Sequence, residues 1–271
     1  MPAENLLLGK TAIITGGTTG IGRAICLGYL KQGADVVVNH LGLEKDSHHL
    51  ESLIVEAEAL KAEKPNAGRL SHQVGDVRKP ETATQLVAAA VEFSSTKRLD
   101  ICVSNAGICT FADFLTLEPN LFEATARTNM DGAFYVTQAA ARQMALHQSP
   151  PGGGIIGVSS ISALVGGGLQ THYTPTKAGV LSLMQSTAVA LGKYSIRCNS
   201  LLPGTIRTQL NEEDLADDTK RTYMEGRIPL GRTGVPEDMA GPAVFLACDE
   251  LSGYVTGASL LVDGGLFVNL Q

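Results

Sequence analysis

The chain has 271 residues, of which 44% are hydrophobic and 18% charged, and its formal net charge at pH 7 is −6. This apolar content is enough for a large core, which excludes a mainly disordered chain. An acidic chain without basic clusters is not expected to bind nucleic acid or an anionic membrane. No run of 18 apolar residues suggests a transmembrane helix, and Glu4 stands where a signal peptide would be positively charged. We therefore expect a cytoplasmic protein.

The cysteines and histidines show no pattern of a cross-linked or metal-bound protein. The five cysteines are scattered without a Cys-x-x-Cys pair, and the six histidines lack metal-ligand spacing. We expect neither a disulfide framework nor a bound metal. Cys109 is interpreted as a pocket or core thiol, because no activating histidine is near it in sequence.

Short apolar runs alternate with helical patterns along the chain. Apolar residues recur at helical spacing over 20–32 and 50–60 and again from Pro80. The expected strands are 11–15, 35–39, 70–74, 99–103, 154–158, 195–201 and 258–262. This alternation predicts a single α/β domain over residues 1–271: a doubly wound Rossmann fold with a seven-stranded parallel sheet and helices on both faces.

A charged stretch at residues 211–227 interrupts this alternation after the sixth expected strand. Two interpretations stay open. The stretch is a solvated surface helix, or it belongs to a mobile lid over a cleft, in which case the lid spans 208–230.

The first expected strand runs directly into the sequence TGGTTGIG at residues 15–22. Gly16, Gly20 and Gly22 give the spacing G-x-x-x-G-x-G, with Thr18 and Ile21 inside the loop. At a strand-to-helix junction, backbone N–H groups and the helix dipole face an anion, and glycine lets the backbone approach it. The loop therefore predicts a nucleotide phosphate site.

Further motifs follow the other expected strands in a fixed order. They are Asp76 after the third strand, NAG at 105–107 after the fourth, Asn129 in the next helix, Ser160 after the fifth strand, Tyr173-x-x-x-Lys177, and Pro203 with Gly204 after the sixth, followed by Thr208. Together with the glycine spacing, this set resembles the short-chain dehydrogenase/reductase family over nearly the whole chain.

The resemblance implies residue roles and an assembly. The implied catalytic residues are Asn129, Ser160, Tyr173 and Lys177. The implied cofactor contacts are Gly16, Thr18, Gly20, Ile21, Gly22, Asn39, Asp76, Val77, Asn105, Gly107, Tyr173, Lys177, Pro203, Ile206 and Thr208. The resemblance also implies a homotetramer.

The choice between NAD and NADP depends on the end of the second strand. An Asp or Glu there bonds the ribose 2′-hydroxyl and repels a 2′-phosphate. This chain has Asn39 followed by His40, and no Arg or Lys stands nearby before Lys45. We expect NAD to be the cofactor, with NADP also accepted.

Tyr173 and Lys177 are four residues apart, so they share one face of a helix that begins near Pro175. A free tyrosine has a pKa of about 10, which is too high for a base at neutral pH. A nearby ammonium group favours the phenolate, and lowering this pKa to about 7 needs about 4 kcal/mol. We expect Lys177 to supply part of it, and Ser160 to hold the reacting oxygen.

The loop over 159–172 has a small, glycine-rich centre with polar ends, which favours a compact polyol or sugar. The candidate substrate contacts are Ser160, Ser162, Gln170, Thr171 and Tyr173. The stretch 211–232 and the tail LLVDGGLFVNLQ resemble the fungal L-rhamnose 1-dehydrogenases of the family, which implies oxidation of a sugar's C1 hydroxyl to a lactone. A 3-ketoacyl-thioester or other carbonyl reductase, and a non-catalytic dinucleotide-binding sensor, stay open as alternatives.

Overall fold

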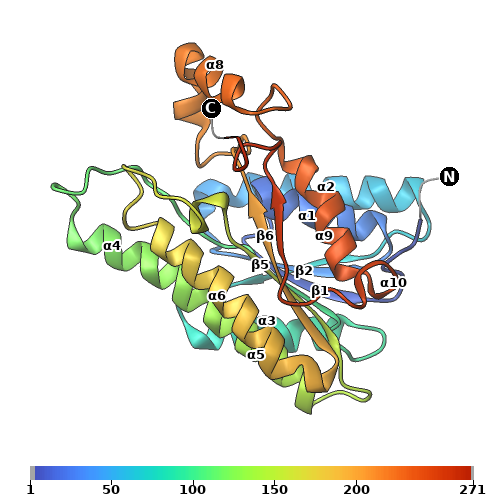
Figure 1. Cartoon of the computed structure of the whole chain (residues 1–271). Helices are drawn as coiled ribbons and strands as arrows, with labels where there is room; N and C mark the ends of the chain where they lie inside the picture. Colours follow the sequence, from blue (N-terminus) through green and yellow to red (C-terminus); the bar gives the residue numbers. More distant parts are fainter. Residues whose placement is uncertain (1–3, 270–271) are drawn as a thin grey trace.

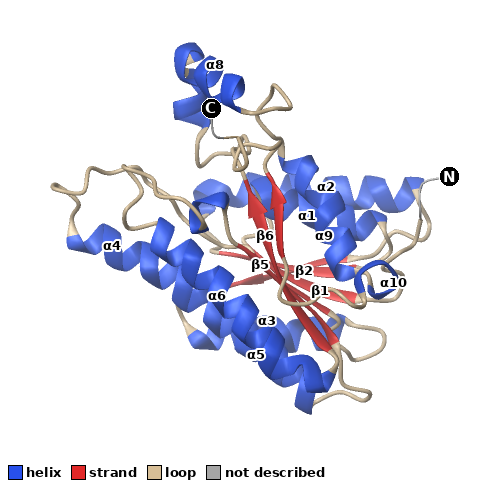
Figure 2. Ribbon diagram, viewed as in Figure 1, coloured by secondary structure: helices blue, strands red, loops and turns tan. Residues whose placement is uncertain are grey.

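Seven parallel strands form one twisted sheet in the order β3-β2-β1-β4-β5-β6-β7 (Figure 2). The computed structural model describes residues 4–269, and their side chains apart from those of Glu213 and Asp214. The strands are β1 Thr11–Thr15, β2 Asp35–His40, β3 Leu70–Val74, β4 Ile101–Ser104, β5 Gly153–Val158, β6 Ile196–Pro203 and β7 Ser259–Val262. The strand order reverses beside β1, and a crevice at the carboxyl ends of the strands is expected at such a point.

Helices cover both faces of the sheet, with α3, α5 and α6 on one face and α1, α2 and α9 on the other (Figure 1). The α-helices are α1 Gly20–Lys31, α2 Ser47–Glu63, α3 Pro80–Phe93, α4 Pro119–Ala126, α5 Gly132–Leu146, α6 Thr174–Leu191, α7 Glu212–Ala216, α8 Asp218–Arg227, α9 Ala240–Ala247 and α10 Asp249–Ser252. Short helical turns are η1 Glu44–Asp46, η2 Arg127–Asp131, η3 Ile161–Ala163, η4 Gly192–Tyr194 and η5 Pro236–Met239.

The central strands are apolar throughout because each face of the sheet has its own core. Ala12 and Ile14 of β1 pack with α1 and α9, whereas Ile13 packs with α3 and α5. A strand buried on both faces has no polar side, which explains the unbroken apolar runs in the sequence. The expected doubly wound fold is thus confirmed.

Several strand boundaries differ from the expected ones by one or two residues. β2 continues to His40 rather than ending at Asn39, and β6 continues to Pro203 because Gly204 N donates to Val262 O at 3.0 Å. β4 begins at Ile101 rather than at Leu99, whose N–H donates to Gln148 Oε1 at 3.1 Å instead of to a strand. Partners distant in sequence therefore set the end of β6 and the start of β4.

Residues 211–227 fold into α7 and α8, which project beyond the carboxyl end of β6 (Figure 1). Most of their described residues are exposed, while Leu215 and Ile228 anchor the segment in the protein. Within residues 4–269, no helix is both long enough and apolar enough to cross a membrane.

Candidate active site

The glycine loop joins the carboxyl end of β1 to α1 through backbone that only glycine adopts easily. Gly16 and Gly20 have φ of +61° and +52°. A Cβ on Gly22 would overlap the carbonyl oxygen of Gly16 and lie 2.6 Å from Asn105 Nδ2. Thr19, the N-cap residue of α1, makes no side-chain cap bond within residues 4–269. The first N–H groups of α1 are therefore available to an anion, which fits the pyrophosphate of a dinucleotide.

Asn105 ties the end of β4 to this loop. Its backbone N–H donates to Thr15 Oγ1 at 2.9 Å, and its Nδ2 donates to Thr15 O at 2.9 Å and to Gly16 O at 3.0 Å. Ala106 N also donates to Thr15 Oγ1 at 3.0 Å. The NAG segment and the glycine loop thus form one hydrogen-bonded unit at the reversal point of the sheet.

The structure brings the expected catalytic residues together beside that unit. Ser160 follows β5, and its hydroxyl is close enough to Tyr173, the residue that precedes α6, to lower the pKa of that phenol. Lys177 Nζ, on the first turn of α6, lies 5.5 Å from the centroid of the Tyr173 ring and donates to Val158 O at 3.0 Å. A Cβ on Gly107 would lie 3.5 Å from Lys177 Nζ and 3.2 Å from Asn129 Oδ1, so four elements converge here.

Asn129 is buried on η2, a π-helical turn between α4 and α5. Its Oδ1 accepts from Ile108 N at 2.8 Å, and its Nδ2 donates to Ile108 O at 2.9 Å and to Thr176 Oγ1 at 3.1 Å. Single π turns are frequent at functional sites. Here the turn presents a carboxamide that holds the segment after NAG against the start of α6.

The pKa values of the two central groups follow their burial. Loss of solvent lowers the pKa of Lys177 to about 8. Burial raises the pKa of Tyr173 above its usual value, and the hydrogen bond from Ser160 opposes this only in part. Lys177 was expected to supply part of the lowering of the tyrosine pKa, but burial dominates in this pocket, because it disfavours both charged forms and the ammonium bonds Val158 O.

The segment after β6 returns to the glycine loop. Thr208 Cγ2 lies 3.3 Å from the Cβ position of Gly20. Ile206 forms a parallel bridge with Gly234, which fixes the start of the segment. The expected contacts Pro203, Ile206 and Thr208 thus lie on one stretch that leads from the sheet to the loop.

Asp76, Val77 and Asn39 already have partners within the protein. Both carboxylate oxygens of Asp76 accept from Arg78, which lowers the pKa of Asp76. Val77 packs on the first residue of α5, Gly132. Asn39 is buried, and its Nδ2 donates to Gly75 O at 2.9 Å and to Gln73 O at 3.3 Å, so this amide holds β2 to the end of β3.

Arg23 is a basic residue at the loop that was not predicted from the sequence. Arg23, on the first turns of α1, donates from Nη1 to Thr18 O at 3.3 Å and to His49 O at 2.9 Å. Its Nη2 forms an ion pair with Glu56 at 2.8 Å. Its position directly after Gly22, the last glycine of the loop, could have identified it from the sequence. These bonds make it a tie between α1 and α2.

The expected substrate contacts line the segment before α6. Gln170 Nε2 donates to Cys109 Sγ at 3.3 Å, and this thiol interacts electrostatically with Tyr173 and Lys177. Ser162 N donates to Ser160 Oγ at 3.0 Å. Thr171 Oγ1 is buried without a hydrogen-bond partner among the described residues. Cys109 and Gln170 therefore join two loops at the catalytic cluster.

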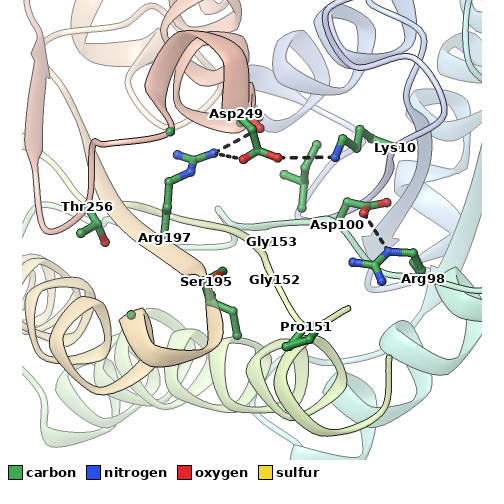
Figure 3. Close-up of a pocket in the computed structure, with 15 residues that line it drawn as sticks. Lys10, Arg98, Asp100, Pro151, Gly152, Gly153, Ser195, Arg197, Asp249 and Thr256 are labelled. Atoms are coloured by element: carbon green, nitrogen blue, oxygen red, sulfur yellow. Dashed lines mark hydrogen bonds and ion pairs between the residues drawn. The ribbon is translucent and has the colours of Figure 1, made fainter. Parts of the chain in front are cut away.

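A separate cavity of about 460 Å³ lies at the opposite edge of the sheet, where β4, β5 and β6 begin (Figure 3). Its charged side chains are paired: Asp249 with Arg197 at 2.9 Å and with Lys10 at 3.4 Å, and Arg98 with Asp100 at 3.5 Å. These pairs join the strand starts to the region of α10, far from the carboxyl ends that carry the catalytic cluster.

Comparison with known proteins identifies the class to which this site belongs. Residues 16–267 match the family described as enoyl-(acyl carrier protein) reductase. The chain is 57% identical to the L-rhamnose-1-dehydrogenase of Scheffersomyces stipitis over 98% of this chain and 99% of that one. It is 55% identical to the L-rhamnose 1-dehydrogenase (NAD(P)(+)) of a Sphingomonas species, with the same coverage.

More distant relatives share the fold. The 3-oxoacyl-acyl-carrier-protein reductase of Thermotoga maritima is 35% identical, over 97% of this chain and 99% of that one. A crystal structure of a short-chain type dehydrogenase/reductase from Mycobacterium marinum superposes with a TM-score of 0.85 at 35% identity, covering 96% of each chain. The chain belongs to the short-chain dehydrogenase/reductase family. It is an oxidoreductase, and its cofactor is a nicotinamide dinucleotide.

Proposed function

We propose that this enzyme oxidises the C1 hydroxyl of L-rhamnose to the lactone, with NAD(P) as the hydride acceptor. The cluster of Ser160, Tyr173 and buried Lys177, with the lysine 5.5 Å from the tyrosine ring, is the observation that carries the reaction type. The 57% identity to an L-rhamnose-1-dehydrogenase over nearly the full length supports the substrate. The products are the lactone, the reduced dinucleotide and one proton.

Each catalytic residue has its own role in the proton transfer. A bound nicotinamide dinucleotide supplies the hydride acceptor and a positive charge. Ser160 Oγ holds the C1 oxygen of the sugar beside Tyr173, and the Tyr173 phenolate takes the proton from that oxygen. The Lys177 ammonium favours the phenolate form of Tyr173 by charge attraction. Because the pKa of Lys177 is about 8, this lysine can also lose a proton near neutral pH. Val158 O and Asn129 keep this end of α6 in place.

The substrate side of the cluster suits a small polar molecule. Gly166 and Gly168 have no described heavy atom within 4 Å of a Cβ position, so this loop leaves room beside Ser160. Gln170 and Ser162 add polar groups at its two ends. Hydroxyl-rich substrates gain specificity from such convergent donors and acceptors.

Two alternative functions can be distinguished from sugar oxidation by experiment. Reduction of a 3-ketoacyl thioester is supported by a relative of only 35% identity. A dinucleotide sensor would not need Asn129, Ser160, Tyr173 and Lys177 together. The deciding experiment follows nicotinamide absorbance with purified enzyme, the cofactor, and a panel of aldoses and ketoacyl thioesters. Turnover of L-rhamnose supports the proposal. Turnover of a thioester alone, or of nothing despite nucleotide binding, refutes it.

Residues 208–230 form a lid in the proposed catalytic cycle. Backbone bonds pin its two ends, from Arg207 N to Gly234 O at 2.9 Å and from Leu230 N to Gly264 O at 3.2 Å, while α7 and α8 between them are largely exposed. Trypsin cleavage after Lys220 or Arg221 should slow when cofactor and sugar are both present. An unchanged cleavage rate would contradict lid closure.

The assembly in the proposed function is a homotetramer in the cytoplasm. Phe134 on α5 is 42% exposed and Val189 on α6 is 88% exposed, so the outer side of these helices offers apolar surface for a second copy. Light scattering of the purified protein measures the number of copies, and a monomer at micromolar concentration would refute this assembly. Cell fractionation tests the location.

A further inference from the structure

Two histidines face each other at the carboxyl ends of β2 and β3. His40 Nε2 lies 3.2 Å from His72 Nδ1, with ring centroids 5.3 Å apart. His40 Nδ1 accepts from Gly42 N at 3.2 Å. Because Nδ1 is an acceptor, the ring hydrogen of His40 belongs on Nε2 and is donated to His72. The pair is therefore a neutral chain with fixed tautomers.

The pair stands where this fold reads the adenosine ribose. A residue at the end of β2 approaches the ribose 2′-position, and a carboxylate there selects the 2′-hydroxyl. The end of β2 is tied to the glycine loop, since Gly17 N donates to Asn39 O at 3.1 Å. Successive side chains of a strand alternate between faces, and the Asn39 amide is bonded to the end of β3. His40, the next residue, offers an imidazole in place of the carboxylate.

We propose that His40, supported by His72, reads the 2′-position of the dinucleotide: the imidazole stays neutral beside a 2′-hydroxyl and takes up a proton from solvent when a 2′-phosphate binds. An imidazolium paired with a phosphate dianion forms a short charge-assisted hydrogen bond. The neutral imidazole keeps its bonds to Gly42 N and His72 and, unlike a carboxylate, carries no charge, so it accommodates a 2′-hydroxyl beside it. One side chain thereby accepts both NAD and NADP, and the preference between them depends on pH.

The surroundings keep this imidazole neutral in the absence of an added anion. Burial and the neighbouring His72 both lower the pKa of His40. Other charged or titratable groups also lie on the elements around this end of β2. They include Arg23 of α1, Glu44, Lys45 and Asp46 of η1, His48, His49, Glu51 and Glu56 of α2, and Asp76, Arg78 and Lys79 after β3. Arg23 is paired with Glu56 at 2.8 Å, and Arg78 with Asp76 at 2.6 Å, so these charges are already compensated.

Proton uptake has a defined structural consequence. A second proton on His40 must go to Nδ1, which breaks the bond from Gly42. Gly42 lies between the exposed side chains of Leu41 and Leu43, in the loop that follows β2. This exposed N–H can turn to water when the bond breaks, and the phosphate bond replaces what His40 loses.

Direct binding of NADH and NADPH, followed by nicotinamide fluorescence between about pH 6 and pH 9, tests the proposal across the titration range of histidine. The ratio of the NADPH to the NADH dissociation constant should rise by about tenfold or more across this range. Calorimetry in buffers of different ionisation heat should show proton uptake with NADPH and little with NADH. No sugar is needed, so the result is independent of the proposed substrate.

Variants separate the histidine from the phosphate, which itself titrates near pH 6. His40→Asn keeps an acceptor for Gly42 N but cannot become charged, so the ratio should lose most of its pH dependence and proton uptake should fall to the level of the phosphate alone. His72→Asn keeps an acceptor for His40 Nε2 but removes an electrostatic effect that lowers the His40 pKa, so NADPH binding should persist to higher pH. His147→Asn, at an exposed position after α5, is the matched control.

The same measurements can overturn the proposal. If His40→Asn keeps the wild-type slope and proton uptake, the 2′-phosphate is read elsewhere. A His72→Asn variant with an unshifted pH profile would show that the pair does not act as a unit. A wild-type ratio that does not change with pH would remove the basis of the inference altogether.

Discussion

A single methyl group on Gly22 tests the close approach inside the glycine loop. In Gly22→Ala the new Cβ overlaps Gly16 O and lies 2.6 Å from Asn105 Nδ2, whereas ordinary contacts begin at 3.4 Å. Both atoms belong to the unit that joins β1 to β4, because Asn105 Nδ2 donates to Gly16 O at 3.0 Å. The methyl group can be accommodated only if the loop moves.

Two destabilising contributions and one stabilising contribution set the change in the free energy of unfolding. Overpacking at a rigid site costs about 1–3 kcal/mol. Loss of the bond between Asn105 and Gly16 costs about 1 kcal/mol, and the better helix propensity of alanine returns about 1 kcal/mol. We expect a net loss of about 2 kcal/mol in the free energy of unfolding, which lowers the melting temperature by about 4–8 °C. A displaced loop that loses one hydrogen bond to a phosphate weakens dinucleotide binding by about 10–100-fold.

Thermal unfolding and calorimetric titration with NAD measure the two quantities on one preparation. Gly241→Ala is the matched control, because Gly241 lies in α9 and no described heavy atom is within 4 Å of its Cβ position. This control should melt at or slightly above the wild-type temperature and bind NAD normally. If Gly22→Ala matches the wild type in both measurements, the loop does not have the close contact that the argument requires.

Three further outcomes are expected. Tyr173→Phe should lower kcat by about 100-fold or more, because the proton acceptor is lost, with dinucleotide affinity by calorimetry changed less than about threefold. The initial rate of sugar oxidation should rise with pH by up to about tenfold per pH unit, because burial raises the pKa of Tyr173, and should flatten above a pH of about 8, where Lys177 loses its charge. Asp238 has a pKa of about 2, lowered by hydrogen bonds from Arg232, so it stabilises the fold above its ordinary pKa and this is lost as pH falls towards 2. Asp238→Asn should therefore lower the melting temperature slightly at pH 7, because exposed pairs contribute little, and match the wild type in strong acid.

Patterns local in sequence predict the frame of the site well. The glycine loop, the NAG segment and the Tyr173–Lys177 pair each occupy a few consecutive residues beside a strand end. Parallel strands bring their carboxyl ends to one edge, so a correct strand order also places these segments correctly. The structure puts Gly107 beside both Asn129 and Lys177, which are 48 residues apart in the chain.

Side-chain partners that come from distant segments were beyond prediction. Asn39 looked available for a ribose because nothing in its own segment shows the carbonyl groups of Gln73 and Gly75 that bind its amide. His72 meets His40 because β2 and β3 pair with Val38 opposite His72. Sequence spacing contains no information on this register, which depends on how the two strands pack against shared helices.

The pKa of Tyr173 shows why residue identity alone misjudges electrostatics. A tyrosine four residues before a lysine suggests attraction between phenolate and ammonium, but the spacing does not show how deeply either group is buried. Burial acts on both groups at once, because it raises the pKa of Tyr173 and lowers that of Lys177. Each of these pKa shifts disfavours the charged form of its group. A further positive charge in the pocket would favour the phenolate of Tyr173. In the proposed mechanism, proton abstraction from a sugar would therefore be favoured beside the oxidised dinucleotide, whose ring is positive, and disfavoured beside the neutral reduced form.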